Sequence, residues 1–364
     1  MIHHQLKKMF SKFTILIFLL SPVLAFAAKG DDEHKVTQVK EFRVNDASSV
    51  NINTKYGKVT VHIWNNPVCK ANITITGFGN DAEQAKRMTE TISIQTKEKD
   101  GDVYITAVSD AASKWFSYKK DNKDYVNIDM DIYVPSKLKS ISIQNNFGDV
   151  LARQLPFPAS LKVNYGFIDI AESSSSISLN IAYTNKARLG KMNKVNVNAA
   201  YSSLNCEKAN EVIFKSSNGT YSFGDIGELN LQSAYDELKF RRVGSMLLRA
   251  NYTDMKMDEL SSSAEISGNY CDIKIRKVGR GFKSLSADIN YTDIRFGVQS
   301  GTPFRARANV KYGNFSASGF DFKNVSEHRE KSSLSYSAIT TNASEASPLI
   351  SVNGKYCDVK VGED

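Results

Sequence analysis

The sequence predicts an all-β fold, a right-handed single-stranded parallel β-helix whose coils contain about 17–22 residues, with an N-terminal β-rich cap region that includes one short helix. Three observations lead to this prediction. An aromatic residue recurs at nearly regular intervals, apolar residues keep fixed distances on both sides of it, and the repeat is too short for βαβ or helical units.

The recurring aromatic residue, termed the anchor, defines the repeat. From Phe147 onward the anchors are 18, 18, 18, 34, 17, 18, 21, 21 and 44 residues apart. The 34-residue gap is interpreted as two steps with Asn218 in place of the aromatic, and the 44-residue gap as two long steps with Tyr336 near its middle. Such a period is typical of a solenoid. The expected structural anchors are Tyr56, Phe147, Tyr165, Tyr183, Tyr201, Tyr235, Tyr252, Tyr270, Tyr291, Tyr312 and Tyr356.

The apolar positions show how each coil bends. Leu161 lies four residues before Tyr165, and Ile168 and Ile170 lie three and five residues after it. Positions an even number apart share one face of a strand, so residues seven apart face one core only if the chain turns near the anchor. We therefore expect two short strands joined at a corner, and we expect the anchors to form an aromatic ladder. Suitable corner residues are Gly166, Gly313, Asn164, Asn251 and Asn290.

The N-terminus has the features of a secretory signal peptide over residues 1–27. Lys7, Lys8 and Lys12 form a basic segment, residues 13–20 are apolar, and Ala25-Phe26-Ala27 is a small-x-small cleavage site. The apolar run is shorter than the roughly 20 residues that a membrane span needs. We therefore expect an exported protein located in the periplasm, at the outer membrane, on the cell surface or outside the cell, with no membrane span after cleavage.

Two further regions follow the signal peptide. Residues 28–135 are predicted to form the cap region, in which residues 50–63 already show the repeat around Tyr56 and residues near 81–90 form a short capped helix. Residues 110–124 contain Trp115 and four lysines and are expected to form a long surface loop. Residues 136–364 are predicted to form the β-helix repeats.

Several of these segments together resemble a known family. The signal peptide, AEQAKRMTETISI, DGDVYIT, YVPSKLKSISIQNNFGDV and the NYTDI-like units are similar to the adhesin-type, β-strand-repeat (autotransporter-adhesin-head-like) proteins exported by Bacteroidota. The resemblance covers most of the chain after the signal peptide. It implies an exported right-handed β-helix of adhesin-like role, with no catalytic residues to carry over.

The net charge argues against one class of partner, and the positions of the cysteines argue against disulfide bonds. Removing the signal peptide takes away three lysines and lowers the formal charge from +8 to +5, and the basic residues are spread among acids, so a nucleic-acid partner is not expected. Cys271 and Cys357 both follow an anchor and are expected four coils apart, roughly 19 Å, which is too far for a disulfide. Cys206 is expected in the core and Cys69 alone, so mostly free thiols are predicted.

An aspartate recurs near the anchor in several coils, and this series of carboxylates is the most prominent candidate for a functional site. A calcium-binding ladder needs a nine-residue glycine-rich repeat that this chain lacks, so we expect these carboxylates to accept hydrogen bonds from turn amides. No cofactor and no metal site are predicted. The acids are Asp149, Asp236, Asp254, Asp272, Asp293 and Asp358.

The sequence favours a non-enzymatic role. His34, His62 and His328 are isolated, and no nucleophile elbow or phosphate-binding loop is present. The leading hypothesis is an adhesin-like protein that binds a glycan, a protein or an envelope component through its lateral surface, with Trp115 as the candidate binding residue. One alternative is an envelope scaffold without an external ligand. Another is a polysaccharide lyase or hydrolase, for which the candidates are Arg241, Arg242 and Asp236.

Overall fold

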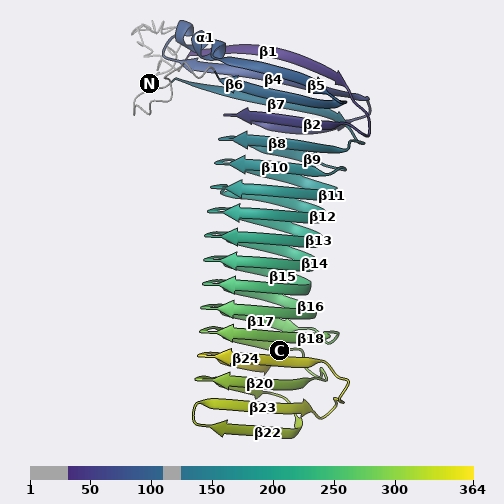
Figure 1. Ribbon diagram of the computed structural model, residues 1–364, viewed down its shortest axis with the longest axis vertical. Coiled ribbons are helices and arrows are strands. Elements are labelled where there is room, and N and C mark those ends of the chain that lie inside the picture. The colour runs from purple at the N-terminus through teal and green to yellow at the C-terminus, as the bar shows by residue number, and fades with distance from the viewer. Residues whose placement is uncertain (1–31, 110–123) are drawn as a thin grey trace, which may run out of the picture.

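The computed structural model describes residues 32–109 and 124–364, which form a long column of stacked β-strands with a broader cap at its N-terminal end (Figure 1). All strands belong to one hydrogen-bonded network, in which many neighbours are parallel. The all-β prediction is confirmed, and the pairing is consistent with a β-solenoid. The signal peptide predicted over residues 1–27 lies outside the described residues.

The repeating unit of the column is a coil with two strand segments that meet at the anchor. The segment before the anchor lies on what we call face 1, and the segment after it lies on face 2. Leu161 in β10 (Ala159–Asn164) pairs with Leu179 on face 1, and Ile168 pairs with Ala187 on face 2. The middle coils stack in chain order, and their long strands cross from face 2 of one coil to face 1 of the next. These strands are β11 (Phe167–Ala182), β12 (Lys186–Ala200), β13 (Ser203–Ser217), β14 (Thr220–Ala234), β15 (Glu237–Asn251) and β16 (Asp254–Asn269).

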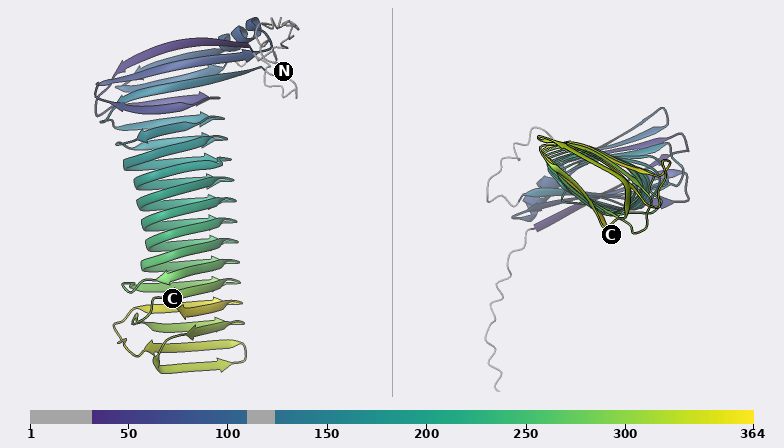
Figure 2. Two further views of the ribbon diagram at one scale, coloured as in Figure 1. Left: turned by 180° about the vertical axis from the view of Figure 1, so that it is seen from behind. Right: turned by 90° about the horizontal axis from the view of Figure 1, so that it is seen from below.

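Alternate residues from both faces point into one continuous core. Leu161, Ile168 and Ile170 around Tyr165 are all buried, which confirms the predicted change of parity at the anchor. The end-on view in Figure 2 shows that the coils enclose a flattened outline, so the two faces are close enough for their aliphatic side chains to pack. A single coil buries few side chains, and neighbouring coils must cover it for the ordering of its backbone to be offset.

The N-terminal cap extends both faces with antiparallel strands. The Tyr56 segment supplies β2 (Ser49–Lys55) and β3 (Val59–Trp64), which stack in parallel on β8 (Ser140–Asn146) and β9 (Val150–Gln154). On face 1, β2 also pairs with β6 (Asp102–Ser109), which forms a hairpin with β5 (Ile92–Lys99). On face 2, β3 pairs with β7 (Tyr125–Pro135), followed by β4 (Val68–Gly79) and β1 (Asp32–Arg43).

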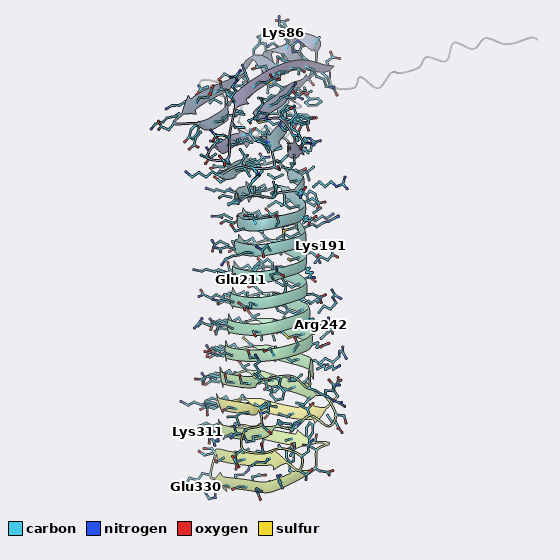
Figure 3. The ribbon with its side chains drawn as sticks, turned by 90° about the vertical axis from the view of Figure 1, so that its right-hand side faces the viewer. Lys86, Lys191, Glu211, Arg242, Lys311 and Glu330 are labelled. Carbon is cyan, nitrogen blue, oxygen red and sulfur yellow. The ribbon has the colours of Figure 1, made fainter. Side chains whose placement is uncertain are left out.

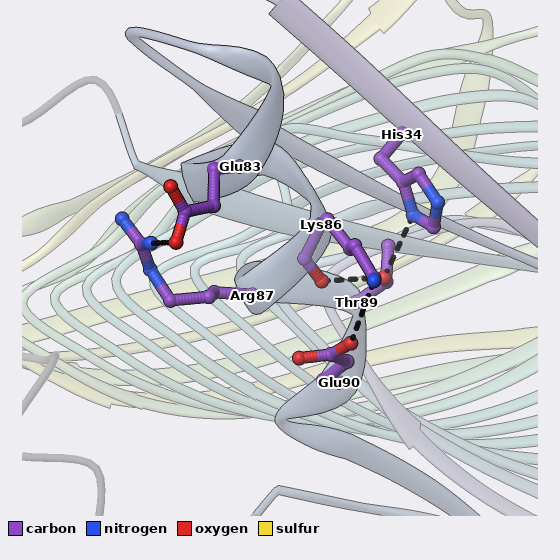
Figure 4. Close-up of polar contacts among 6 residues, drawn as sticks. All are labelled: His34, Glu83, Lys86, Arg87, Thr89 and Glu90. Atoms are coloured by element: carbon purple, nitrogen blue, oxygen red, sulfur yellow. Dashed lines mark hydrogen bonds and ion pairs between the residues drawn. The ribbon is translucent and has the colours of Figure 1, made fainter.

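The one helix in the described residues, α1 (Ala82–Glu90), packs on β1 and β4 where the short helix was expected. It begins with Asp81, whose side chain accepts a hydrogen bond from the Gln84 backbone N–H at 2.7 Å. Figure 4 shows the Glu83–Arg87 ion pair on its surface, and His34 Nδ1 lies 3.0 Å from Thr89 Oγ1. The buried residues Ala85 and Met88 place the helix over the end of the core.

The C-terminal coil departs from chain order. In β17 (Asp272–Val278), β18 (Ser284–Asn290) and β19 (Asp293–Val298) the column continues as before, but the next coil is the last one in the chain. Its strands, β24 (Leu349–Lys355) and β25 (Asp358–Glu363), lie between β18 and β19 on one side and β20 (Arg305–Lys311) and β21 (Asn314–Ser318) on the other. The yellow β24 therefore lies directly above β20 in Figure 1.

A hairpin closes the C-terminal end of the column. It consists of β22 (Phe322–Glu330) and β23 (Ser333–Thr340), and β23 pairs antiparallel with β20. The expectation that Tyr336 marks another step of the repeat is wrong, because Tyr336 lies in β23 with its ring buried. The segment was misread because an antiparallel hairpin strand has the same alternating pattern as a coil strand.

The inserted coil also corrects the predicted separation of two cysteines. Cys271 and Cys357 follow Tyr270 and Tyr356, and only the Tyr291 coil lies between them. Their separation is therefore two coil steps, roughly 10 Å, instead of the expected four. All four cysteines, at positions 69, 206, 271 and 357, are buried and unpaired.

Candidate binding surface

The anchors form a ladder of stacked rings along one corner of the column. Each anchor has a positive φ, between 48° and 61°. Neighbouring rings stack with centroids 4.7–5.5 Å apart and planes inclined by 1–16°. In spatial order the two runs of the ladder are Tyr56, Phe147, Tyr165, Tyr183 and Tyr201, then Tyr235, Tyr252, Tyr270, Tyr291, Tyr356 and Tyr312.

The corner conformation belongs to the aromatic residue itself, which sequence reasoning missed. We expected glycine and asparagine to make the corner, because a left-handed backbone costs a residue with a Cβ about 1–2 kcal/mol. At these positions the left-handed backbone reverses the parity of the chain and directs the ring outward. Stacking on two neighbours contributes about 0.5–1.5 kcal/mol per pair, which is enough to offset that cost.

The ladder presents ring edges to solvent. Apart from half-buried Tyr56, its members expose about half of their surface, from 46% at Tyr183 to 60% at Tyr235. Ring faces are covered by neighbouring rings, so the accessible part is a row of edges and hydroxyl groups. Burial raises the pKa of the Tyr56 hydroxyl. Such a row combines apolar contact area with hydrogen-bonding groups at a constant spacing.

Polar columns flank the ladder on face 1. The residue before the anchor is asparagine in several coils, and Asn164 donates to Asn146 at 2.8 Å. Asn269 donates to Asn251 at 3.1 Å, and Asn290 donates to Asn269 at 3.3 Å. These side-chain bonds run along the column, so the amides on this side of the ladder are ordered by the stacking of coils.

Charged columns lie on the other side of the ladder, on face 2. An acidic column contains Glu237, Asp254, Asp272, Asp293 and Asp358 on consecutive stacked coils. Two residues further along each strand is a basic column of Lys239, Lys256, Lys274, Arg295 and Lys360. Like charges repeat along the column, and opposite charges alternate across it. Lys239 Nζ contacts Glu237 Oε1 at 2.8 Å and lowers the pKa of that carboxyl.

A second set of charges lines the outer sides of the column. Figure 3 shows Lys191 and Arg242 along one side and Glu211 along the opposite side. Arg242 pairs with Glu259 at 3.6 Å, and Lys194 pairs with Glu211 at 2.7 Å, each across one coil step. These pairs are exposed and contribute little to stability.

A groove opens on face 2 where the cap departs from the column. Strand β3 pairs with β9 only over Val59–Val61, and the space beyond, about 500 Å³, is lined by His62, Arg153 and Asp169 among others. The His62 ring stacks on Tyr133 with centroids 4.6 Å apart, and a ring nitrogen lies 3.0 Å from an Asp131 carboxylate oxygen. The groove therefore has an aromatic and charged rim next to an apolar floor.

The corner acids mostly have the predicted structural role. Asp149 accepts a hydrogen bond from the Phe167 N–H, Asp293 from the Asp358 N–H, and Asp358 from the Asn314 N–H. Buried Asp236 accepts from the Gly219 N–H and from two serine hydroxyls. Among the described residues, Asp254 and Asp272 accept no backbone hydrogen bond, so the prediction holds for four of the six. Within the ranges 32–109 and 124–364, no group of His, Cys, Asp and Glu side chains is arranged to hold a metal ion.

The residues considered for polysaccharide cleavage are not brought together. Asp236 points into the corner of its coil, whereas Arg241 and Arg242 are exposed further along the strand and form ion pairs with Asp225 and Glu259. The four cysteine thiols are buried and therefore do not contribute to a surface site. Burial raises the pKa of Cys69 and of Cys206 to about 12 and that of Cys357 to about 11.

The remaining candidate binding residue, Trp115, lies outside the described residues, as does most of its loop. In the described part of the chain, no helix is long and apolar enough to cross a bilayer.

Comparisons with known proteins give similar structures but no close relative. No protein-family model matches the sequence, and no curated protein matches it. A protein provisionally named as a cell adhesion protein from Clostridium sporogenes has 10% identity over 92% of this chain and 100% of its own, with a TM-score of 0.21. One provisionally named as an adhesin from Parabacteroides distasonis has 10% identity over 89% of this chain and 97% of its own, with a TM-score of 0.31.

Two further solved structures bear on the expected resemblance. A protein provisionally named as lipid-binding, from Parabacteroides distasonis, has 10% identity over 89% of this chain and 96% of its own, with a TM-score of 0.28. Another provisional adhesin, from Bacteroides fragilis, has 12% identity over 90% of this chain and 97% of its own, with a TM-score of 0.20. The expected similarity to Bacteroidota adhesins is thus supported only by the names given to these solved structures, at low sequence identity.

Proposed function

We propose that this protein is an exported, non-enzymatic, adhesin-like right-handed parallel β-helix that binds a glycan, a protein or another envelope component through its lateral surface. The observation that carries the proposal is the exposed aromatic ladder with its flanking columns. Ring edges, amides, acids and bases recur at one coil step, about 4.8 Å, over much of the column. A periodic surface of this kind is suited to a partner that also repeats, such as a polysaccharide chain.

The form of the surface supports binding in preference to catalysis. Ladder and columns lie on a convex corner and a flat face, and the candidate catalytic residues Asp236, Arg241 and Arg242 do not converge. A catalytic site needs an acid, a base or a nucleophile within reach of one substrate bond. Repeated contacts of modest strength give avidity instead, because each engaged unit raises the effective concentration at the next.

The binding test uses the chain after signal cleavage, applied to immobilised envelope polysaccharides and to intact cells. The ladder variant carries Tyr252→Asn, Tyr270→Asn and Tyr291→Asn. Asparagine already occupies the anchor position at Asn218 with a φ of 56°, so the variant should fold. We expect at least a tenfold loss of binding, because three consecutive rings disappear from the ladder.

A matched control carries Ser178→Ala, Asn196→Ala and Asn230→Ala, three exposed positions of face 1 away from the ladder. The control should bind as the unaltered protein does. Equal binding by both variants would rule out the ladder as the contact surface. Turnover of an acidic polysaccharide by the purified protein would overturn the non-enzymatic part of the proposal.

Location is tested separately by protease treatment of intact cells that carry a tagged chain, with permeabilised cells as the control. Release of fragments from intact cells is the expected result for an adhesin. Protection until permeabilisation would instead favour the alternative, an envelope scaffold on the periplasmic side without an external ligand.

A further inference from the structure

The aromatic ladder is interrupted at one coil. Asn218 occupies the anchor position between Tyr201 and Tyr235, with the same left-handed backbone as its neighbours. The Tyr201 N–H bonds to the Ser217 carbonyl, and the Asn218 N–H bonds to the Ala234 carbonyl, so the three anchors occupy equivalent places on consecutive coils. The break is therefore a missing ring in an otherwise continuous register.

The missing ring leaves two ring faces opposite each other. Tyr201 stacks on Tyr183 at 5.2 Å and Tyr235 on Tyr252 at 4.9 Å, and neither has an aromatic neighbour on its other side among the described residues. Tyr201 and Tyr235 are two coil steps apart, roughly 9.6 Å. Elsewhere in the ladder one ring fills that same interval. The space above Asn218, which we call the slot, thus has the height of one planar ring.

The chain does not fill the slot with its own side chains. Asn218 is exposed, its side chain is much shorter than a tyrosine's, and that side chain makes no hydrogen bond among the described residues. Tyr221, three residues after Asn218, is fully buried and lies on the inner side of the corner. Gly219 makes room for it, since a Cβ at Gly219 would lie 2.3 Å from the Tyr221 hydroxyl oxygen.

On face 1 the rim of the slot is small and uncharged. On face 1 the residues before the three anchors are Ala200, Ser217 and Ala234, whereas asparagines occupy this column beside other parts of the ladder. Small side chains leave the edge of the slot open to a ring that enters from this side. On face 2 the residues two positions after the same anchors are Ser203, Thr220 and Glu237, and Glu237 is already paired with Lys239. These neighbours carry no net charge, which favours a neutral ligand, and the two opposed π-faces favour a flat ring over a puckered one.

We propose that the slot between Tyr201 and Tyr235 binds one neutral planar aromatic ring of phenol type, stacked on both tyrosines above Asn218. The bound ring completes the ladder in the way a tyrosine at position 218 would. This inference does not rest on the proposed adhesive function, because one ring site needs no repetitive partner.

The test uses 4-methylphenol as the probe with the full chain after signal cleavage, followed by isothermal titration calorimetry and by NMR of the probe's methyl group. Saturable binding with a stoichiometry of one and an upfield shift from the flanking rings is expected. The non-aromatic analogue 4-methylcyclohexanol should bind at least tenfold more weakly. Equal binding of the two compounds, or no saturable binding of 4-methylphenol, would overturn the proposal.

Three variants locate the site. Asn218→Tyr fills the slot and should abolish probe binding while it raises the melting temperature, since it joins the two runs of the ladder. Asn218→Gly, compatible with the positive φ, should bind as tightly as the unaltered chain or more tightly. Tyr235→Asn removes one wall and should weaken binding at least tenfold. Undiminished binding by Asn218→Tyr would overturn the proposal, and adhesion by that variant is expected to persist because every original ring remains.

Discussion

The middle coils and the C-terminal coils are built from the same unit but are assembled in different orders. From β10 to β19, each coil stacks on the one that precedes it in the chain. At the C-terminal end the ring order is Tyr291, Tyr356, Tyr312, because the last coil enters between two earlier ones. The repeat therefore determines the shape of a coil but does not determine which coil is its neighbour.

The reason lies in the pairing of parallel strands. Any two coils with a matching register offer the same backbone donors and acceptors, so pairing alone does not select between neighbours. The terminal hairpin makes the selection. Strand β23 pairs antiparallel with one side of β20, which leaves only the other side for the last coil. The outer strand β22 is exposed along its length, charged and irregular at Asn324, features that discourage pairing with a further chain.

The largest effect is expected from a disulfide cross-link that reports the order of the coils. Ser286 lies beside Ser351 on the inserted coil, and Ser351 lies beside Arg307. We expect Ser286→Cys with Ser351→Cys to form a disulfide nearly completely, because adjacent strands place the Cα atoms at about 4.8 Å. Ser286→Cys with Arg307→Cys should form none. Non-reducing electrophoresis of a digest checks both, and the opposite pattern would show that the coils stack in chain order.

A large effect on stability is expected when a buried leucine of the middle coils is truncated. Leu231 is fully buried between two neighbouring coils, so Leu231→Ala should lower the free energy of unfolding by about 2–5 kcal/mol. Leu334 in the terminal hairpin is 2% exposed and serves as the matched position. We expect Leu334→Ala to loosen the hairpin first. Denaturant unfolding measures the global effect and hydrogen exchange the local one. Equal global losses would contradict the distinction.

The ladder gives a smaller effect that depends on position. Tyr252 stacks on two rings and Tyr312, at the end of its run, on one. Tyr252→Asn should therefore cost about 1–3 kcal/mol and Tyr312→Asn about half of that. Thermal unfolding of the two variants provides the measurement. If the two variants lose the same stability, ring stacking is not what stabilises the corner.

The smallest effect concerns the buried thiols at high pH. Folding raises their pKa values, so their contribution to stability is complete below about pH 8.5, where unfolded thiols are still protonated, and is lost as the pH rises. In the unaltered chain, Cys206 should lower the free energy of unfolding by about 1 kcal/mol per pH unit between pH 9 and 11. The Cys206→Ala variant should not show this part of the decrease. For Cys357 in the inserted coil the loss should end nearer pH 11, since its pKa is about 11 instead of 12. Denaturant midpoints measured across this range, against the unaltered chain, test both; parallel curves would contradict the prediction.

The sequence predicted much of the repeat because its physical basis is local. Alternation of buried and exposed residues is set within a few residues of each anchor, so Leu161 and Ile168 could be assigned to the core from spacing alone. The short helix was recognisable from Asp81 and the residues that follow it. The left-handed backbone of the anchors could not be recognised from the sequence. A tyrosine with positive φ is uncommon unless neighbouring coils supply the rings that stabilise it.

The candidate surface was only partly visible in the sequence. Ladder members and corner acids were identified as residues, but the groove between His62 and Arg153 was not, because these two residues are far apart in the chain and meet only where β3 separates from β9. The slot at Asn218 was read only as a substituted anchor. Its meaning depends on the two ring faces that the stacked neighbours place around it.

Three features of this protein follow from its amino-acid sequence alone: the length of the coil, the residues that line its core and the corner at which it turns. Each of them depends on residues within about ten positions. Three others become visible only in the folded molecule: the order of the C-terminal coils, the left-handed backbone of the tyrosines and the ring-sized opening above Asn218. These depend on contacts between segments far apart in the chain, where identical backbone pairing offers several partners and the surrounding structure selects one.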